Sequence, residues 1–189
     1  LEMIMNKKIG LITFHDTANH GAALQTYATL HTLARFEFDA EVIDYTNKFR
    51  SSLYNVSKKL AYDWAEKNYV AFIKTVIAAP LIKNRMVGFN NFYRNFTPRS
   101  VKAYHSNSDL SGIEKKYYKI IVGSDQVWLP LSMYNKFFNL LFVDNIVPKI
   151  SYSSSFGVSQ IPLWQKKQTK YYLERFDASK NVFISQFKL

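Results

Sequence analysis

Cysteine is absent from this 189-residue sequence, and histidine, glycine and proline are scarce, with four, six and five residues. The absence of cysteine excludes disulfides, thiolate zinc sites and a cysteine nucleophile. No Gly-x-Ser-x-Gly elbow occurs, so the sequence gives no support for hydrolysis by that route. The longest apolar run, residues 76–82, is too short to span a bilayer and contains Pro80. Residues 1–5 lack a secretory cleavage pattern, so we expect a cytoplasmic protein.

Acidic residues are also few, and their scarcity is uneven. The chain carries a net charge of +11, and residues 46–105 contain eleven Lys or Arg against only Asp63 and Glu66. This excess indicates an anionic partner, such as a phosphorylated substrate or an acidic lipid surface, unless it is simply a solvated helical face. Nucleic acid is not an expected partner, because the basic segment contains no known nucleic-acid-binding motif.

The hydrophobic pattern predicts an α/β domain. Residues 8–14 and 40–45 read as strands, and a helical pattern between them covers residues 22–36. Later segments complete an alternation of strands and helices: strands at 117–122, 139–143, 150–153 and 181–185, and a helix at 163–176. We therefore expect a Rossmann-like, largely parallel sheet with helices on both faces.

A helical, aromatic-rich insert is expected between the second and third of these strands, at about residues 49–98. Its pattern predicts two or three helices broken near Pro80. The last helix carries aromatic residues at positions 89, 92, 93 and 96, a spacing that places them on one face. We expect this stripe to pack against the sheet.

Three polar loops follow directly after predicted strands, at residues 15–21, 123–128 and 153–157. Ligands of open parallel sheets bind beyond the carboxyl ends of the strands, so the loops are expected to form one composite site. His15, Asn19, His20 and Gly21 belong to the first loop, which opens a helix and so favours an anion. Asn19 has a simpler alternative role, which is to cap that helix.

The second loop combines Ser124, Asp125, Gln126 and Trp128, side chains suited to sugar hydroxyls and to a sugar ring face. Asp125 is a candidate general base for an acceptor hydroxyl, or else a turn residue that binds nearby backbone N–H groups. Ser155 and Gly157 belong to the third loop. No metal site is expected, because the spacing of the two first-loop histidines and Asp16 matches no established pattern.

Several of these segments together resemble the polysaccharide pyruvyl transferase family. They are Ile-Gly-Leu-Ile-Thr-Phe-His at 9–15, Asn-His-Gly-Ala-Ala-Leu-Gln-Thr-Tyr-Ala at 19–28, Val-Ile-Asp-Tyr at 42–45, Ile-Val-Gly-Ser-Asp-Gln-Val-Trp at 121–128 and Ile-Ser-Tyr-Ser-Ser-Ser-Phe-Gly at 150–157. They occur in the family's order. Phe187 stands where the family usually has an arginine in its continuation.

The resemblance implies the N-terminal half of a GT-B-like two-domain enzyme that transfers pyruvyl from phosphoenolpyruvate to a sugar hydroxyl of a cell-surface glycan or its lipid-linked precursor. On this basis we expect an N-terminal extension at residues 1–7, a Rossmann-like domain at 8–178 and a divergent or truncated end at 179–189. The second domain is expected to be absent, and this chain is expected to be inactive on its own. No cofactor is expected. Asp125 and His20 are the expected catalytic residues. The expected substrate-binding residues are His15, Asn19, Gly21, Ser124, Gln126, Trp128, Ser155 and Gly157.

Two other functions fit the same sequence. A nucleotide-sugar glycosyltransferase would keep the fold and change the transferred group. A non-catalytic binding module would pair with another chain that supplies the second domain. The basic, aromatic-rich segment between Phe49 and Phe96 would suit peripheral association with an anionic membrane surface or a polyprenyl-phosphate carrier.

Overall fold

A computed structural model describes residues 8–15, 17–45, 55–106, 108–130, 137–143, 148–174, 176 and 183–184. The expected extension at 1–7, Asp16 and nearly all of the expected divergent end at 179–189 lie outside these ranges.

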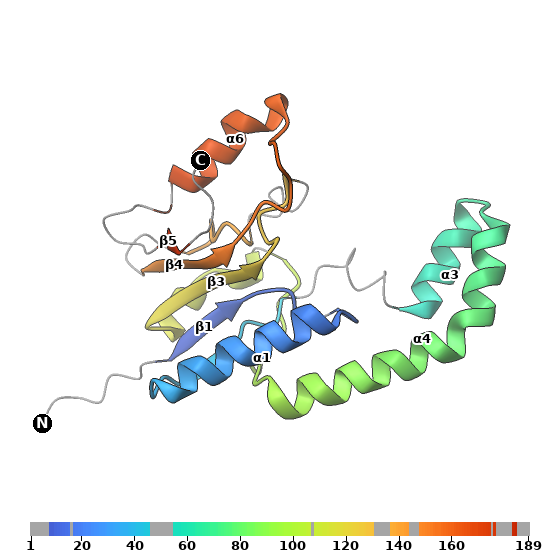
Figure 1. Cartoon of the computed structure of the whole chain (residues 1–189), viewed down its shortest axis with the longest axis horizontal. Coiled ribbons are helices and arrows are strands. Elements are labelled where there is room, and N and C mark those ends of the chain that lie inside the picture. Colours follow the sequence, from blue (N-terminus) through green and yellow to red (C-terminus); the bar gives the residue numbers. More distant parts are fainter. Residues whose placement is uncertain are drawn as a thin grey trace, which may run out of the picture.

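The centre of the molecule is a parallel sheet of five strands in the order β2-β1-β3-β4-β5 (Figure 1). The strands are β1 (Ile9–Ile12), β2 (Ala40–Val42), β3 (Lys119–Asp125), β4 (Lys149–Ser154) and β5 (Phe183–Ile184). Every neighbouring pair is parallel, and Ile12 of β1 lies opposite Val122 of β3. The expected α/β class and parallel sheet are confirmed.

Alternating side chains of the strands build separate cores on the two faces of the sheet. On one face, Ile9 and Leu11 pack with Leu30 of α1 (His20–Arg35). On the other, Ile12 and Ile120 join a larger cluster. That cluster includes residues of the 3-10 helices η1 (Ser108–Leu110) and η2 (Ile113–Lys116) and Phe176, just after α6 (Leu163–Glu174).

Residues 139–143 were expected to form a strand, and this expectation is wrong. Residues 137–142 lie in turns, and Leu140 has a positive φ of 52°, which a strand does not allow. The apolar side chains still serve the core: Phe137, Phe138 and Leu140 are buried in the larger cluster. The apolar run thus predicted correctly that these residues are buried, but it did not predict their backbone conformation.

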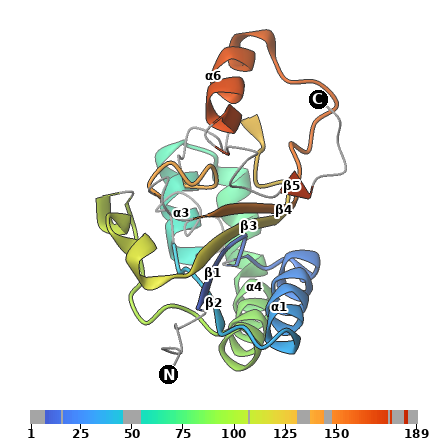
Figure 2. The same cartoon turned by 90° about the vertical axis from the view of Figure 1, so that its left-hand side faces the viewer.

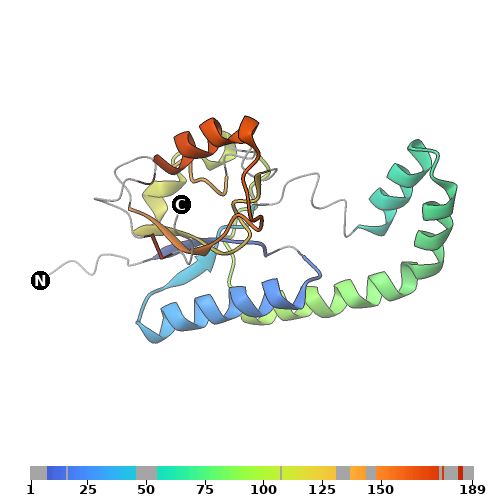
Figure 3. The same ribbon diagram turned by 45° about the horizontal axis from the view of Figure 1, so that its top comes forward.

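The segment between β2 and β3 forms a helical hairpin of α3 (Val56–Ala65) and α4 (Tyr69–Phe96). A break near Pro80 was expected, but α4 is a single helix of 28 residues that contains Pro80 in its interior. A proline removes one backbone hydrogen bond and bends a helix without necessarily ending it, and α4 curves along its length (Figure 1). The hairpin tip projects away from the sheet (Figure 3).

The aromatic stripe of α4 packs against α1, and not against the sheet as expected. Phe89 and Tyr93 are buried with Ala18 and Ala23, and Tyr27 of α1 makes edge-to-face contacts with Phe92 and Phe96. Figure 2 shows α1 and α4 side by side on one side of the sheet. The second half of α4 therefore packs along one side of α1.

Candidate functional site

The carboxyl ends of the parallel strands share one edge of the sheet, and the strand order reverses between β1 and β3. The chain passes from β1 outward to β2, then returns across β1 to β3 and continues to β4 and β5. At such a switch point the connections that follow the two central strands run in opposite directions. In open α/β sheets, ligands bind between them, beyond the carboxyl ends of the strands. The loop after β1 and the end of β3 flank it.

The first loop is held by side chains of α4. Tyr93 donates its hydroxyl to the carbonyl of Thr17 at 3.1 Å, and Arg85 donates to the carbonyl of Ala18 at 2.6 Å. Asn19 caps α1, because its Oδ1 accepts a hydrogen bond from the backbone N–H of Ala22. The capping alternative for Asn19 is therefore realised.

His20 and Gly21 form the exposed first turn of α1, beside this cap. The His20 ring lies against Phe89, with 4.9 Å between ring centroids. Within the described ranges no hydrogen bond occupies its ring nitrogens, so both are open to a ligand. The positive end of the helix dipole adds to the suitability of this turn for an anionic group.

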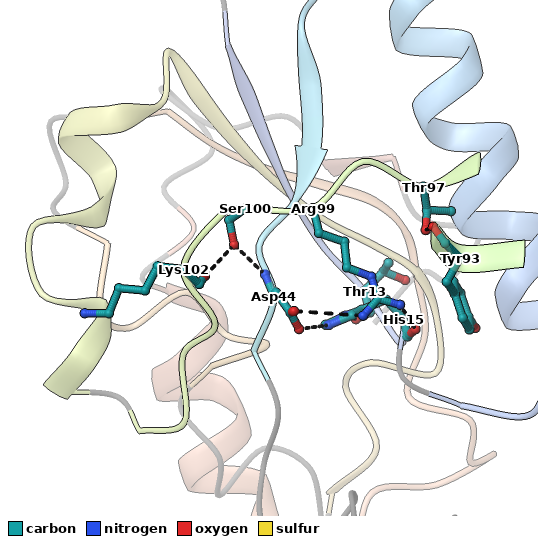
Figure 4. A network of polar contacts seen from close by, with 8 residues as sticks. All are labelled: Thr13, His15, Asp44, Tyr93, Thr97, Arg99, Ser100 and Lys102. Atoms are coloured by element: carbon teal, nitrogen blue, oxygen red, sulfur yellow. Dashed lines mark hydrogen bonds and ion pairs between the residues drawn. The ribbon is translucent and has the colours of Figure 1, made fainter. Parts of the chain in front are cut away.

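His15 lies below this surface in a buried polar network and is only 2% exposed. Its Nδ1 is 3.0 Å from the carbonyl oxygen of Thr13, and its Nε2 is 3.0 Å from Asp44 Oδ1 (Figure 4). The guanidinium of Arg99 lies 3.9 Å from Asp44 Oδ2 and donates to the carbonyl of His15. Both ring nitrogens are thus engaged, and His15 is placed to hold the loop and not to contact a substrate directly.

Asp44 and Arg99 were not among the expected site residues. Asp44 follows β2 at the same sheet edge, so the strand-end rule applied to the other loops could have identified it. Arg99 follows the helical hairpin in the sequence. It lies beside β2, because Arg99 and Val42 form an isolated parallel β-bridge. No sequence spacing links Arg99 to the first loop.

The second and third loops meet at the ends of β3 and β4. The backbone N–H of Ser155 donates to the carbonyl of Asp125 at 2.9 Å, and that of Trp128 donates to the carbonyl of Ser155. Gly157 lies so close to Gln126 that an added Cβ would meet Gln126 Oε1 at 2.6 Å. The expected juxtaposition of these two loops is therefore present.

Asp125 forms a local turn at this junction. Its Oδ1 accepts from the backbone N–H of Gln126 at 2.6 Å, as the structural alternative predicted. Among the described residues Oδ2 has no hydrogen-bond partner, and the side chain is partly exposed. Asp125 can hold its turn with one oxygen and accept from a substrate hydroxyl with the other.

Gln25 connects the second loop to the first helix. Its side-chain amide donates to Ser124 Oγ, which spans the switch point from α1 to β3. Gln25 was not an expected site residue, although it lies one helical turn after Gly21. The contact ties Ser124 at the end of β3 to α1.

The expected role of Trp128 needs correction. Its side chain is 3% exposed, its Nε1 donates to the carbonyl of Phe138, and its ring contacts Phe156 and Phe176. A sugar ring cannot stack on an indole that is covered in this way. Trp128 anchors the second loop to the core instead.

The structure thus brings Ser124, Asp125 and Gln126 together with Ser155 and Gly157. It places His20 and Gly21 on the other side of the switch point, and no described contact joins His20 to Asp125. Within the described part of the chain, no three His, Asp or Glu side chains are grouped to hold a metal ion.

The chain matches the model of a known protein family. The model of the family described as polysaccharide pyruvyl transferase matches residues 19–182, which is most of the chain. Neither the curated proteins nor the solved structures compared with the chain gave a match.

Proposed function

The chain belongs to the polysaccharide pyruvyl transferase family, and we propose that it binds the sugar acceptor for pyruvyl transfer from phosphoenolpyruvate. The acceptor is a hydroxyl-bearing sugar of a cell-surface glycan or of its lipid-linked precursor. The observation that carries this proposal is the cluster of hydroxyl, carboxylate and amide groups of Ser124, Asp125 and Gln126 at the switch point. These groups match the hydrogen-bonding needs of vicinal sugar hydroxyls.

The proposed reaction joins one pyruvyl group to two hydroxyls. The first hydroxyl oxygen bonds to C2 of phosphoenolpyruvate while its C3 methylene gains a proton and becomes a methyl group. The second hydroxyl oxygen then bonds to C2 and inorganic phosphate leaves, which gives a cyclic ketal that carries the carboxylate. Each hydroxyl gives up one proton: the first balances the proton that C3 gains, and the second leaves with the phosphate. A general base that accepts these protons from the hydroxyls assists the bond formation.

Asp125 is the proposed base, because its Oδ2 has no described hydrogen-bond partner and its Oδ1 is held by the Gln126 N–H. His20 is the proposed proton donor or anion ligand at the exposed start of α1, where phosphate or the pyruvyl carboxylate would meet the helix dipole. Ser155 and Gly157 shape the acceptor side of the crevice. His15 and Asn19 hold the first loop in place.

We further propose that the donor's phosphate is bound largely by a second, GT-B-like domain, so that this chain alone binds acceptor without turnover. Phosphoenolpyruvate is a cytoplasmic metabolite in this scheme, which places the reaction in the cytoplasm or at the inner face of the membrane. Phosphoenolpyruvate-dependent phosphate release by the 189-residue chain alone would refute the requirement for a second domain.

The test compares variants in a protein that contains this chain together with a complete second domain. Asp125→Asn is expected to lower kcat by about 10²–10⁴-fold, the usual contribution of a general base. Glu174→Gln, which changes an exposed acid on α6, is the matched control and should leave kcat unchanged. Phosphate release and formation of a pyruvyl ketal, measured by mass spectrometry, are the readouts.

Two outcomes would redirect the proposal. Transfer from a nucleotide sugar, with no reaction from phosphoenolpyruvate, would favour a glycosyltransferase. Acceptor binding without transfer from either donor would favour a non-catalytic binding module.

A further inference from the structure

The hairpin of α3 and α4 projects from the sheet (Figures 1 and 3), and many large apolar side chains within its residues 55–88 are exposed to solvent. Ile77 and Leu81 are each 74% exposed. The other large exposed apolar and aromatic side chains of the hairpin are Tyr62, Trp64, Tyr69, Val70, Ile73, Val76 and Val87. A monomer in water rarely presents so many adjacent apolar groups, so this surface calls for a partner.

Four of the exposed apolar residues lie along one face of α4. Val70, Ile73, Ile77 and Leu81 follow one another at spacings of three, four and four, which align them on a helix. Thr75, on the opposite side, is buried in the hairpin. The outward face of α4 is therefore the apolar one.

The interior of the hairpin is polar. Asp63 is buried, accepts hydrogen bonds from Lys59 at 3.0 and 3.1 Å, and accepts another from Thr75 at 3.1 Å. A buried charge needs such partners to be tolerated. The buried side chains within residues 55–88 of the hairpin, Asp63 and Thr75, are thus polar, while many of its large apolar side chains face solvent, which reverses the usual arrangement of a water-facing hairpin.

Aromatic side chains cluster at the turn between the two helices. Trp64 is 61% exposed and contacts Tyr69 and Phe72 edge-on or tilted, while Tyr62 is also exposed. Exposed Trp and Tyr are characteristic of the boundary between lipid headgroups and acyl chains, because their rings have one apolar and one polar part.

Positive charge surrounds this apolar face. Residues 55–88 contain six Lys or Arg and two acids, and one of the acids, Asp63, is buried against Lys59. Lys67, Lys74 and Lys83 are exposed on the hairpin. This combination of apolar, aromatic and cationic groups complements an anionic lipid surface, which attracts basic segments and accepts apolar side chains below its headgroups.

We propose that the α3–α4 hairpin docks this protein onto an anionic lipid surface. The outward face of α4 and the aromatic turn enter the interface, and Lys67, Lys74 and Lys83 contact the headgroups. In the described ranges no helix combines the length and apolarity required to cross a membrane. The proposed contact is peripheral, with the hairpin lying on the membrane surface. This inference depends on the hairpin alone and not on the group that the protein transfers.

Vesicle co-sedimentation of the full chain tests the proposal. We expect binding to vesicles that contain phosphatidylglycerol, weak binding to pure phosphatidylcholine, and a decrease as salt is raised. Ile77→Gln/Leu81→Gln and Lys74→Glu/Lys83→Glu should each weaken binding by at least about tenfold. The matched controls on exposed positions of α6, Leu163→Gln and Lys166→Glu/Lys167→Glu, should have little effect.

Quenching by brominated lipids tests insertion directly. In a Trp164→Phe variant, the remaining tryptophans are the exposed Trp64 and the buried Trp128. We expect bromine in the acyl chains to quench Trp64 in anionic vesicles. Absence of vesicle binding at low salt, equal effects of the hairpin and α6 variants, or binding without quenching would each overturn the proposal. Dimers in sedimentation that Ile77→Gln/Leu81→Gln abolishes, without vesicle binding, would assign the face to a second copy instead.

Discussion

His15 Nε2 lies 3.0 Å from Asp44 Oδ1, and this contact ties the loop after β1 to the segment after β2. Arg99 lies beside the same carboxylate and stacks over the ring of Tyr93, with 5.1 Å to its centroid. Tyr93 in turn holds Thr17. The first loop is therefore fixed by a continuous set of contacts that reaches from β2 to α4.

Asp44→Ala should destabilise the fold, because it leaves Nε2 of the buried His15 ring without its hydrogen-bond partner. We expect a loss of about 1–3 kcal/mol in the free energy of unfolding, measured by urea denaturation. The control Glu174→Ala removes an exposed ion pair with Lys170, whose charged atoms are 3.8 Å apart, and should change stability by less than about 0.5 kcal/mol. Equal effects would mean that the network does not stabilise the fold.

Gly123 should not tolerate a side chain. Its φ is +129°, and an added Cβ would overlap the backbone oxygen of Tyr152 on β4. Gly123→Ala is expected to cost on the order of 3 kcal/mol or to prevent folding. Gly88→Ala, within α4 and with nothing within 4 Å of the new methyl, should instead gain up to about 1 kcal/mol. Thermal unfolding of both variants makes the comparison.

Comparison of Gly157→Ala with Gly112→Ala distinguishes displacement of the Gln126 side chain from backbone strain. The new methyl would displace the Gln126 side chain, whereas Gly112→Ala, at a similar positive φ of 76°, meets open space. Both variants should lose about 1 kcal/mol from the positive φ. Only Gly157→Ala should also weaken acceptor binding, measured by calorimetry with an oligosaccharide acceptor. Equal binding by the two variants would remove Gln126 from the proposed acceptor site.

We expect the free energy of unfolding to fall at alkaline pH because of Tyr117. Burial, followed by its 2.8 Å hydrogen bond to Glu41, raises the pKa of the Tyr117 hydroxyl well above its ordinary value. The folded state therefore retains this proton when the unfolded chain loses it. Its contribution is fully present below about pH 10, the unfolded pKa of tyrosine, and is lost as pH rises further.

Tyr117→Phe should lose about 1 kcal/mol at pH 7, where the hydrogen bond is intact, and should then show a shallower decline above about pH 10. Tyr118→Phe, on the partly exposed neighbouring residue, is the control and should keep the decline of the unsubstituted protein. Urea unfolding between pH 7 and 11 is the measurement. Identical slopes for the two variants would contradict the assignment to Tyr117.

The sequence predicted the sheet because buried parallel strands have short apolar runs that local composition reveals. Residues 9–12 and 119–125 are strands, and the loops that follow them lie at the same edge. The helix start at Asn19 was also readable, because capping is a local interaction. The expectation for residues 139–143 was wrong, because the same apolar composition can fill a core from turns.

Sequence by itself determined which loops follow the strands, and therefore that Ser124, Asp125 and Gln126 belong at the carboxyl edge. Tertiary structure decided what each side chain does there. It buried Trp128, joined Gln25 to Ser124, and brought Arg99 to His15 across 84 positions of the chain. The physical reason is that the positions of the strands along the chain follow from a local period, whereas burial and hydrogen bonding depend on neighbours that only the folded chain brings together.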